Sequence, residues 1–256
     1  MGKIFSIARY LFLESVRDRL FIMLMLISVI VVAGNFALDF FDQGIQDRII
    51  FDFGSSLASL LGAFLCLYLT TSQIRAQLDS KKAYFILTSE CSRTHFIIGK
   101  WLGAIIFTAF NVLIIFGEIF LIIYFNSGLF SRLTLIYFYI VTLKLSLLGA
   151  IAAFFCVTSS LVVAPALSVF IYFIGHWGSY ISYAIEKSGG SPLVLNISGL
   201  ITGYLLPNFK YYTAEHVITE NFEGAAGYLV MLTLYTLAAD VIILGAAALV
   251  FKKKDL

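Results

Sequence analysis

Three charged residues, Glu118, Lys144 and Asp240, lie inside long apolar runs of the sequence. A charge at the centre of a bilayer costs about 2.5–3.5 kcal/mol on insertion scales, so such a residue usually has a partner or a function. Counted from the end of each run that we place outside the membrane, Lys144 and Asp240 lie at nearly the same depth, and Glu118 is shallower. We therefore predict a Lys144–Asp240 ion pair, with Glu118–Lys144 as the alternative.

The predicted pair has two interpretations, and the residues alone leave both open. A buried salt bridge between two helices fixes their register and does nothing more. Ionisable groups within a membrane also mark pathways for substrates, ions or protons. The first interpretation is structural and the second is functional.

Other patterns that carry chemistry are absent from the sequence. Gly99-Lys100 is followed by Trp101, so there is no phosphate-binding G-x-x-x-x-G-K-[ST] loop. Neither H-E-x-x-H nor G-x-S-x-G occurs. The three histidines are far apart in the sequence: His95, His176 and His216. We expect no catalytic residue, no metal site and no cofactor in this chain.

The composition places the chain in a membrane. Of 256 residues, 61% are hydrophobic and 12% are charged, whereas a soluble domain is close to half apolar and a quarter charged. A soluble globule of this size has too little interior to bury so much apolar surface. The net charge of +2 is too small for a phosphate-binding surface, so we expect no nucleic-acid partner.

Six apolar runs are long enough to cross a bilayer, which takes about 20 residues each. The runs are Leu20–Leu38, Phe53–Ile74, Trp101–Phe125, Leu133–Val157, Leu161–Tyr183 and Tyr228–Phe251. Twelve of the 17 lysines and arginines lie on one side of this arrangement, and the positive-inside rule makes that side the cytoplasm. The sequence therefore predicts an all-α integral membrane protein with six transmembrane helices, both termini cytoplasmic, forming a single domain over residues 1–256.

Three segments connect or precede the spans. Residues 1–19 predict an interfacial helix, because Ile4, Ala8, Leu11 and Phe12 share one face of a helical wheel. Residues 75–100 form the longest polar segment on the cytoplasmic side. Residues 184–227 form a long outer loop, and its apolar stretch 193–206 is too short to span, which favours a re-entrant or interfacial helix.

Small residues recur at intervals of four in the second run, at Gly54, Ala58 and Gly62. This spacing permits close packing of helices in membranes. We interpret the three residues as a packing surface, with a dimer interface as one possible use.

The order of elements resembles a known family. Arg93 is followed six residues later by Gly99-Lys100, at the start of the third run, and Leu206-Pro207-Asn208-Phe209 precedes the sixth. With the interfacial N-terminal helix, these features resemble the permease subunits of type-2 ABC transporters, the exporter-like family with six spans per subunit. The resemblance extends over essentially the whole chain.

The resemblance implies a permease subunit of an ABC exporter in the inner, cytoplasmic membrane, surrounded by lipid. A second copy or a paralogue would complete the pathway, and a separate P-loop ABC ATPase would bind ATP and magnesium, so this chain would not itself be an enzyme. The regions expected to contact the ATPase are roughly Ile4–Asp18 and Ser80–Arg93. The candidate coupling residues are Arg9, Glu14, Arg17, Lys81, Lys82, Tyr84, Phe85, Leu87, Glu90 and Arg93.

Two other functions stay open. An ion- or proton-coupled secondary transporter would use Lys144, Asp240 and Glu118, although the sequence has no inverted repeat. A membrane anchor or scaffold subunit would transport nothing. The apolar spans argue against a hydrated channel and favour a lipid-like or amphipathic cargo.

Overall fold

The computed structural model describes residues 2–17, 19, 22–23, 26, 29, 43–79, 92–127, 132–187, 207–213 and 225–253. Every regular element in these ranges is a helix. The elements are α1 (Gly2–Val16), α3 (Gln43–Asp79), α5 (Arg93–Ser127), α6 (Arg132–Thr158), α7 (Val163–Lys187), the short 3₁₀ helix η3 (Phe209–Tyr212) and α10 (Ala225–Lys253).

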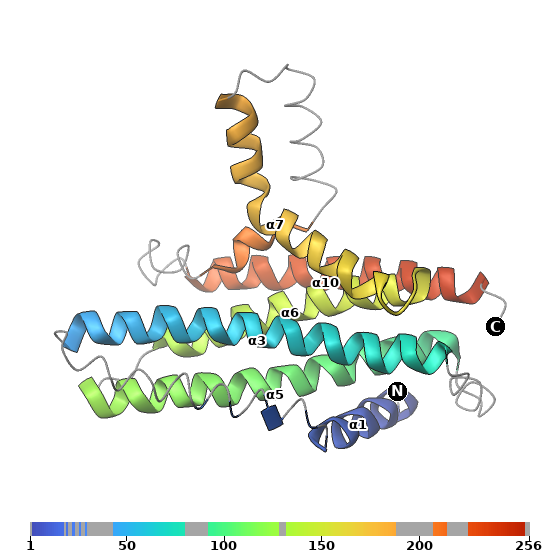
Figure 1. Cartoon of the computed structure of the whole chain (residues 1–256), viewed down its shortest axis with the longest axis horizontal. Helices are drawn as coiled ribbons and strands as arrows, with labels where there is room; N and C mark the ends of the chain where they lie inside the picture. The colour runs from blue at the N-terminus through green and yellow to red at the C-terminus, as the bar shows by residue number, and fades with distance from the viewer. Residues whose placement is uncertain are drawn as a thin grey trace.

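Four long helices, α3, α5, α6 and α10, lie lengthwise against one another and form the body of the molecule (Figure 1). α6 is at the centre, because it contacts α3, α5, α7 and α10, and its apolar stretch is the most buried of the four. α10 is the least buried, and much of its surface is apolar and exposed. Such a surface suits contact with lipid chains.

Four of the six predicted apolar runs are long helices in the structure. The segments long and apolar enough to cross a membrane are Asp47–Arg75, Arg93–Phe125, Leu133–Thr158 and Ala226–Lys253, and each contains a predicted run. The chain is thus compatible with a multi-pass membrane protein. Two helices extend into the segment 75–100 that was predicted as polar: α3 ends at Asp79 and α5 begins at Arg93. Arg, Gln, Ala and Lys, which occur in these extensions, favour helix.

The first and fifth predicted spans are not confirmed. Leu20–Leu38 and the outer stretch 193–206 lie almost wholly outside the described residues. α7 offers a shorter apolar helix, Val163–Trp177, and Figure 1 shows its C-terminal part turning away from the bundle. The turn between α6 and α7 is tight: α6 ends at Thr158 and α7 begins at Val163, with the Ala164 amide donating to the Ser160 carbonyl at 3.0 Å.

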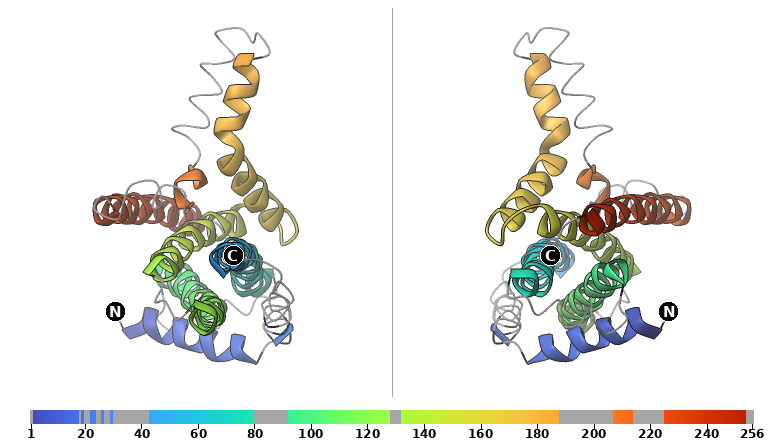
Figure 2. Two further views of the ribbon diagram at one scale, coloured as in Figure 1. Left: turned by 90° about the vertical axis from the view of Figure 1, so that its left-hand side faces the viewer. Right: turned by 90° about the vertical axis from the view of Figure 1, so that its right-hand side faces the viewer.

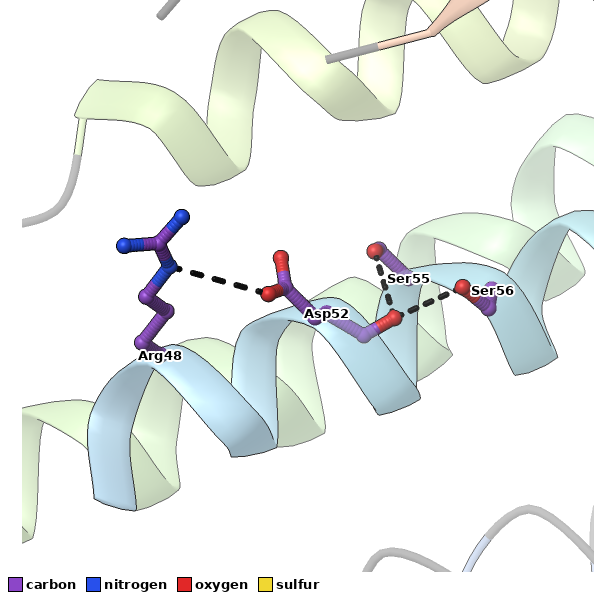
Figure 3. Close-up of polar contacts among 4 residues, drawn as sticks. All are labelled: Arg48, Asp52, Ser55 and Ser56. Atoms are coloured by element: carbon purple, nitrogen blue, oxygen red, sulfur yellow. Dashed lines mark hydrogen bonds and ion pairs between the residues drawn. The ribbon is translucent and has the colours of Figure 1, made fainter. Parts of the chain in front are cut away.

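The helix ends predicted to face the cytoplasm gather at one end of the bundle. The end of α3, the start of α5, the α6–α7 turn and the end of α10 all lie there (Figure 1). At the other end, the exposed Arg48 lies 3.9 Å from the Asp52 carboxylate, one helical turn away (Figure 3). An exposed pair of this kind adds little stability, but it balances the positive charge of Arg48 at the end of the bundle that is predicted to lie outside the cytoplasm.

α1 crosses the bundle instead of running along it (Figure 2). Ala8 and Leu11 are buried against α5, and the ring of Phe12 lies 5.4 Å from that of Phe107, edge to face. The predicted apolar face of this helix is therefore confirmed. Two glycines of α5, Gly99 and Gly103, provide the space for the crossing: a Cβ on Gly103 would lie 2.9 Å from the Ala8 carbonyl oxygen.

The small residues of α3 pack within the chain. A Cβ on Gly54 would lie 2.7 Å from Ile119 of α5, and one on Gly62 would lie 2.7 Å from Leu145 of α6. Packing was the correct interpretation, but neighbouring helices of the same chain already cover both glycines. They are therefore not a free dimer surface.

Candidate functional site

Lys144 is a buried cation in the middle of the bundle. Its side chain is 4% exposed, in the middle of α6. The ammonium donates a hydrogen bond to the Ser59 hydroxyl of α3 at 3.0 Å. It also lies 5.2 Å from the ring centroid of Tyr172 on α7, which is within the range of a cation–π contact. Both partners are neutral.

The predicted Lys144–Asp240 ion pair is wrong. Lys144 faces α3 and α7, whereas Asp240 accepts a hydrogen bond from the Ser146 hydroxyl at 2.6 Å. Two positions along a helix are separated by about 200° of rotation, so Lys144 and Ser146 point to opposite sides of α6. Equal depth in the membrane was a sound inference, but it carries no information on the direction in which a side chain points.

Asp240 and Glu118 each keep a buried oxygen without a hydrogen-bond partner in the described part of the chain. Asp240 is 3% exposed, and its Oδ1 is unpaired while Oδ2 accepts from Ser146. The Oε2 of Glu118 is likewise unpaired. The alternative pair, Glu118–Lys144, is not formed among these residues either. The three charges predicted to act together therefore occupy separate environments.

Arg93 joins the start of α5 to the end of α10. Its Nη1 donates to the carbonyl oxygens of Phe251 at 2.9 Å and Lys252 at 3.3 Å, and the guanidinium lies 5.6 Å from the Phe251 ring centroid. The last carbonyls of a helix have no partner within it, so an arginine is well suited to bind them. Ser92 begins α5, because its hydroxyl accepts from the His95 amide at 3.2 Å.

Lys100 links three helices at the same end. It is 1% exposed, and its ammonium donates to the Gln73 side-chain oxygen of α3 at 2.9 Å. It also lies 5.9 Å from the Tyr10 ring centroid of α1 and interacts electrostatically with Glu14. Arg93, Gly99 and Lys100 form one motif in the sequence. In the structure Arg93 contacts α10, Gly99 contacts α1, and Lys100 contacts both α1 and α3. We call this cluster the basic-end junction.

The predicted coupling residues are only partly within the described ranges. Arg9 and Glu14 lie on the exposed side of α1, and Arg17 is exposed directly after its end, so a partner can reach all three. The other six predicted before Arg93 lie outside the described residues: Lys81, Lys82, Tyr84, Phe85, Leu87 and Glu90. Their role stays a prediction.

Residues 207–213 form a brace between α7 and α10. The Asn208 side chain accepts from the Lys210 amide at 3.1 Å and begins η3. Phe209 is fully buried, with its ring 5.2 Å from that of Tyr172. The Tyr212 hydroxyl is hydrogen-bonded to that of Thr236 on α10 at 2.7 Å, and burial raises the pKa of Tyr212.

Replacing Gly175 with alanine is expected to loosen this brace. The added Cβ would lie 2.5 Å from the Pro207 carbonyl oxygen and 2.6 Å from the Phe209 ring, so the brace must shift, at a cost of about 1–3 kcal/mol. The midpoint of thermal unfolding of the purified protein should fall. Gly245→Ala in α10 is the control, since a Cβ there meets nothing. Equal midpoints for the two variants would contradict the close contact.

The contacts of Gly99 and Gly103 with α1 were not predicted from the sequence, although these two glycines show the same four-residue spacing that was noticed in α3.

No protein-family model matches the sequence, and no curated protein matches it either.

Proposed function

We propose that this chain is the permease subunit of an ABC exporter in the cytoplasmic membrane. In this proposal it forms the substrate pathway with a second copy or a paralogue, and a separate P-loop ATPase supplies ATP hydrolysis. The observation that carries the proposal is the basic-end junction, where α1, α5 and α10 are tied together beside the segment expected to contact the ATPase.

The junction supports transmission of movement from a partner to the helices. Residues 80–91 lie between α3 and α5 in the sequence, and Arg93, two residues after them, binds the end of α10. Lys100 joins α1 to α3. A displacement of residues 80–91 would therefore pull on α10 and α1 together. Coupling also requires two arrangements of these helices that the partner can select between, and the proposal includes them.

Purification of the tagged full-length protein from native membranes in a mild detergent tests the proposal. We expect a P-loop ATPase to co-purify in a fixed ratio, and mass spectrometry would identify it. A second six-span chain in the sample would establish a heterodimer. If no ATPase is recovered under conditions that preserve other transporter complexes, the proposal fails.

Replacing both Phe85 and Leu87 with aspartate is expected to release the ATPase. An apolar patch buried at an interface loses its favourable contacts when charges replace it. The control variant, Ser80→Asp with Ser89→Asp, adds the same charge to the same segment at polar positions. The ATPase content of the purified complex should fall only in the first variant. Full ATPase content in both would place the docking surface elsewhere.

A second candidate function is an ion- or proton-coupled secondary transporter. The buried charges of Lys144 and Asp240 favour it, because intramembrane ionisable residues are costly and are retained where they act. Their placement on opposite sides of α6 argues against a direct relay between them. Transport in vesicles discriminates the two functions: an ABC exporter requires ATP, and a secondary transporter requires an ion gradient without nucleotide.

A further inference from the structure

Lys144 has hydrogen-bonding capacity left over. An ammonium carries three N–H donors; one is used by Ser59, and the face of Tyr172 attracts the charge. In the described residues no carboxylate contacts it, since Asp240 is turned to Ser146. A buried charge is ordinarily paired with an opposite charge, and here neutral groups take that place.

His176 adds a further polar group to this environment. It lies one turn after Tyr172 on α7, with the two rings 5.2 Å apart, and it interacts electrostatically with Lys144. Its Nδ1 is buried and has no hydrogen-bond partner within the described ranges. The Lys144 ammonium of α6 thus has the Ser59 hydroxyl of α3 as a hydrogen-bond partner, and Tyr172 and His176 of α7 belong to its surroundings inside the bundle.

We propose that Lys144, Ser59, Tyr172 and His176 bind the anionic head of an amphipathic molecule, a carboxylate or a phosphate. The anion supplies the opposite charge that Lys144 lacks, and charge-assisted hydrogen bonds are the strong ones. The inference names a substrate class for the proposed permease, and only in that respect does it rest on the proposed function.

The surroundings favour a molecule with an apolar tail. An apolar groove of about 260 Å³ lies between α6, α7 and α10 and includes Ile151, Ile171 and Ile242. Ile151 is seven residues after Lys144, which places it on nearly the same face of α6, about 10 Å further along. A tail lying towards the groove would keep the head of the molecule at Lys144.

The test is equilibrium binding of radiolabelled dodecyl phosphate to the membrane protein alone, in nanodiscs of phosphatidylcholine without nucleotide. We expect saturable binding that unlabelled dodecyl phosphate and dodecanoate displace and dodecanol does not. Lys144→Met should weaken binding about 10- to 100-fold, the range for loss of a hydrogen bond to a charged group. Lys144→Arg should retain most of it, and Lys210→Met, at an exposed lysine of the brace, should change nothing.

Equal displacement by dodecanol, or unchanged binding in Lys144→Met, would overturn the inference. Displacement by inorganic phosphate at the same affinity would also overturn it, because the ligand would then be a free anion. If Lys144→Met does not fold, Ser59→Ala and the comparison of charged with uncharged ligands on the wild type still decide the question. Binding without a co-purifying ATPase would keep this inference and remove the proposed function, and an ATPase without Lys144-dependent binding would do the reverse.

Discussion

Replacing Gly103 with leucine is expected to detach α1 from the bundle. The first added carbon would already lie 2.9 Å from the Ala8 carbonyl oxygen and 3.0 Å from its Cα, and backbone cannot rotate away as a side chain can. Overpacking a buried contact costs about 1–3 kcal/mol, which lowers the midpoint of thermal unfolding of a chain of this size by roughly 2–12 °C. Exposure of the fully buried Leu11 adds to this loss.

Limited trypsin digestion provides the local measurement. Arg9 and Arg17 are exposed but lie in α1 or at its end, and proteases cut chains that have opened locally. Cleavage at these arginines should therefore be faster in Gly103→Leu. Gly117→Leu is a matched control on the same helix, where a Cβ meets nothing. If both variants are cleaved at the wild-type rate, α1 does not depend on the Gly103 contact.

The long helices were predictable because hydropathy averages over many residues. A run such as Leu133–Val157 keeps its meaning whatever its neighbours are, since about 20 apolar residues in sequence suit a bilayer. The apolar face of α1 was predictable for a similar reason, because Ala8 and Leu11 recur with the helical period. Both predictions need only local sequence, and the structure confirms them.

Side-chain pairing was not predictable because it depends on the rotation of each helix. Lys144 and Asp240 were predicted to lie at the same depth, but Asp240 contacts Ser146, which is two residues after Lys144 and on the opposite side of α6. The spacing of residues along one helix does not show how a neighbouring helix is rotated about its own axis. For the same reason the contacts of Arg93 were not predicted, because its partners lie more than 150 residues later in the chain, at the end of α10.

Replacing Lys144 with methionine is expected to stabilise the protein. Its partners in the described chain are Ser59 and Tyr172, so methionine removes a costly buried charge and retains the unbranched shape. Replacing a whole buried ion pair with apolar residues is often neutral or stabilising by about 1–4 kcal/mol. Replacing a buried charge that has no charged partner leaves no opposite charge behind, so we expect a gain of about that size here. The midpoint of thermal unfolding, measured without added amphipath, should rise by roughly 3–10 °C, and Lys210→Met should leave it unchanged.

The sign of this change separates two roles for Lys144. A lysine held in a structural ion pair leaves its partner charged and buried when it is removed, which costs about 3–5 kcal/mol, so the midpoint would fall. A lysine whose opposite charge arrives with a ligand has no partner to abandon, so the midpoint of the ligand-free protein rises while ligand binding is lost. If the charge of Lys144 is retained for function, Lys144→Met is more stable than the wild type and no longer binds the ligand. Loss of a structural ion pair cannot produce this combination.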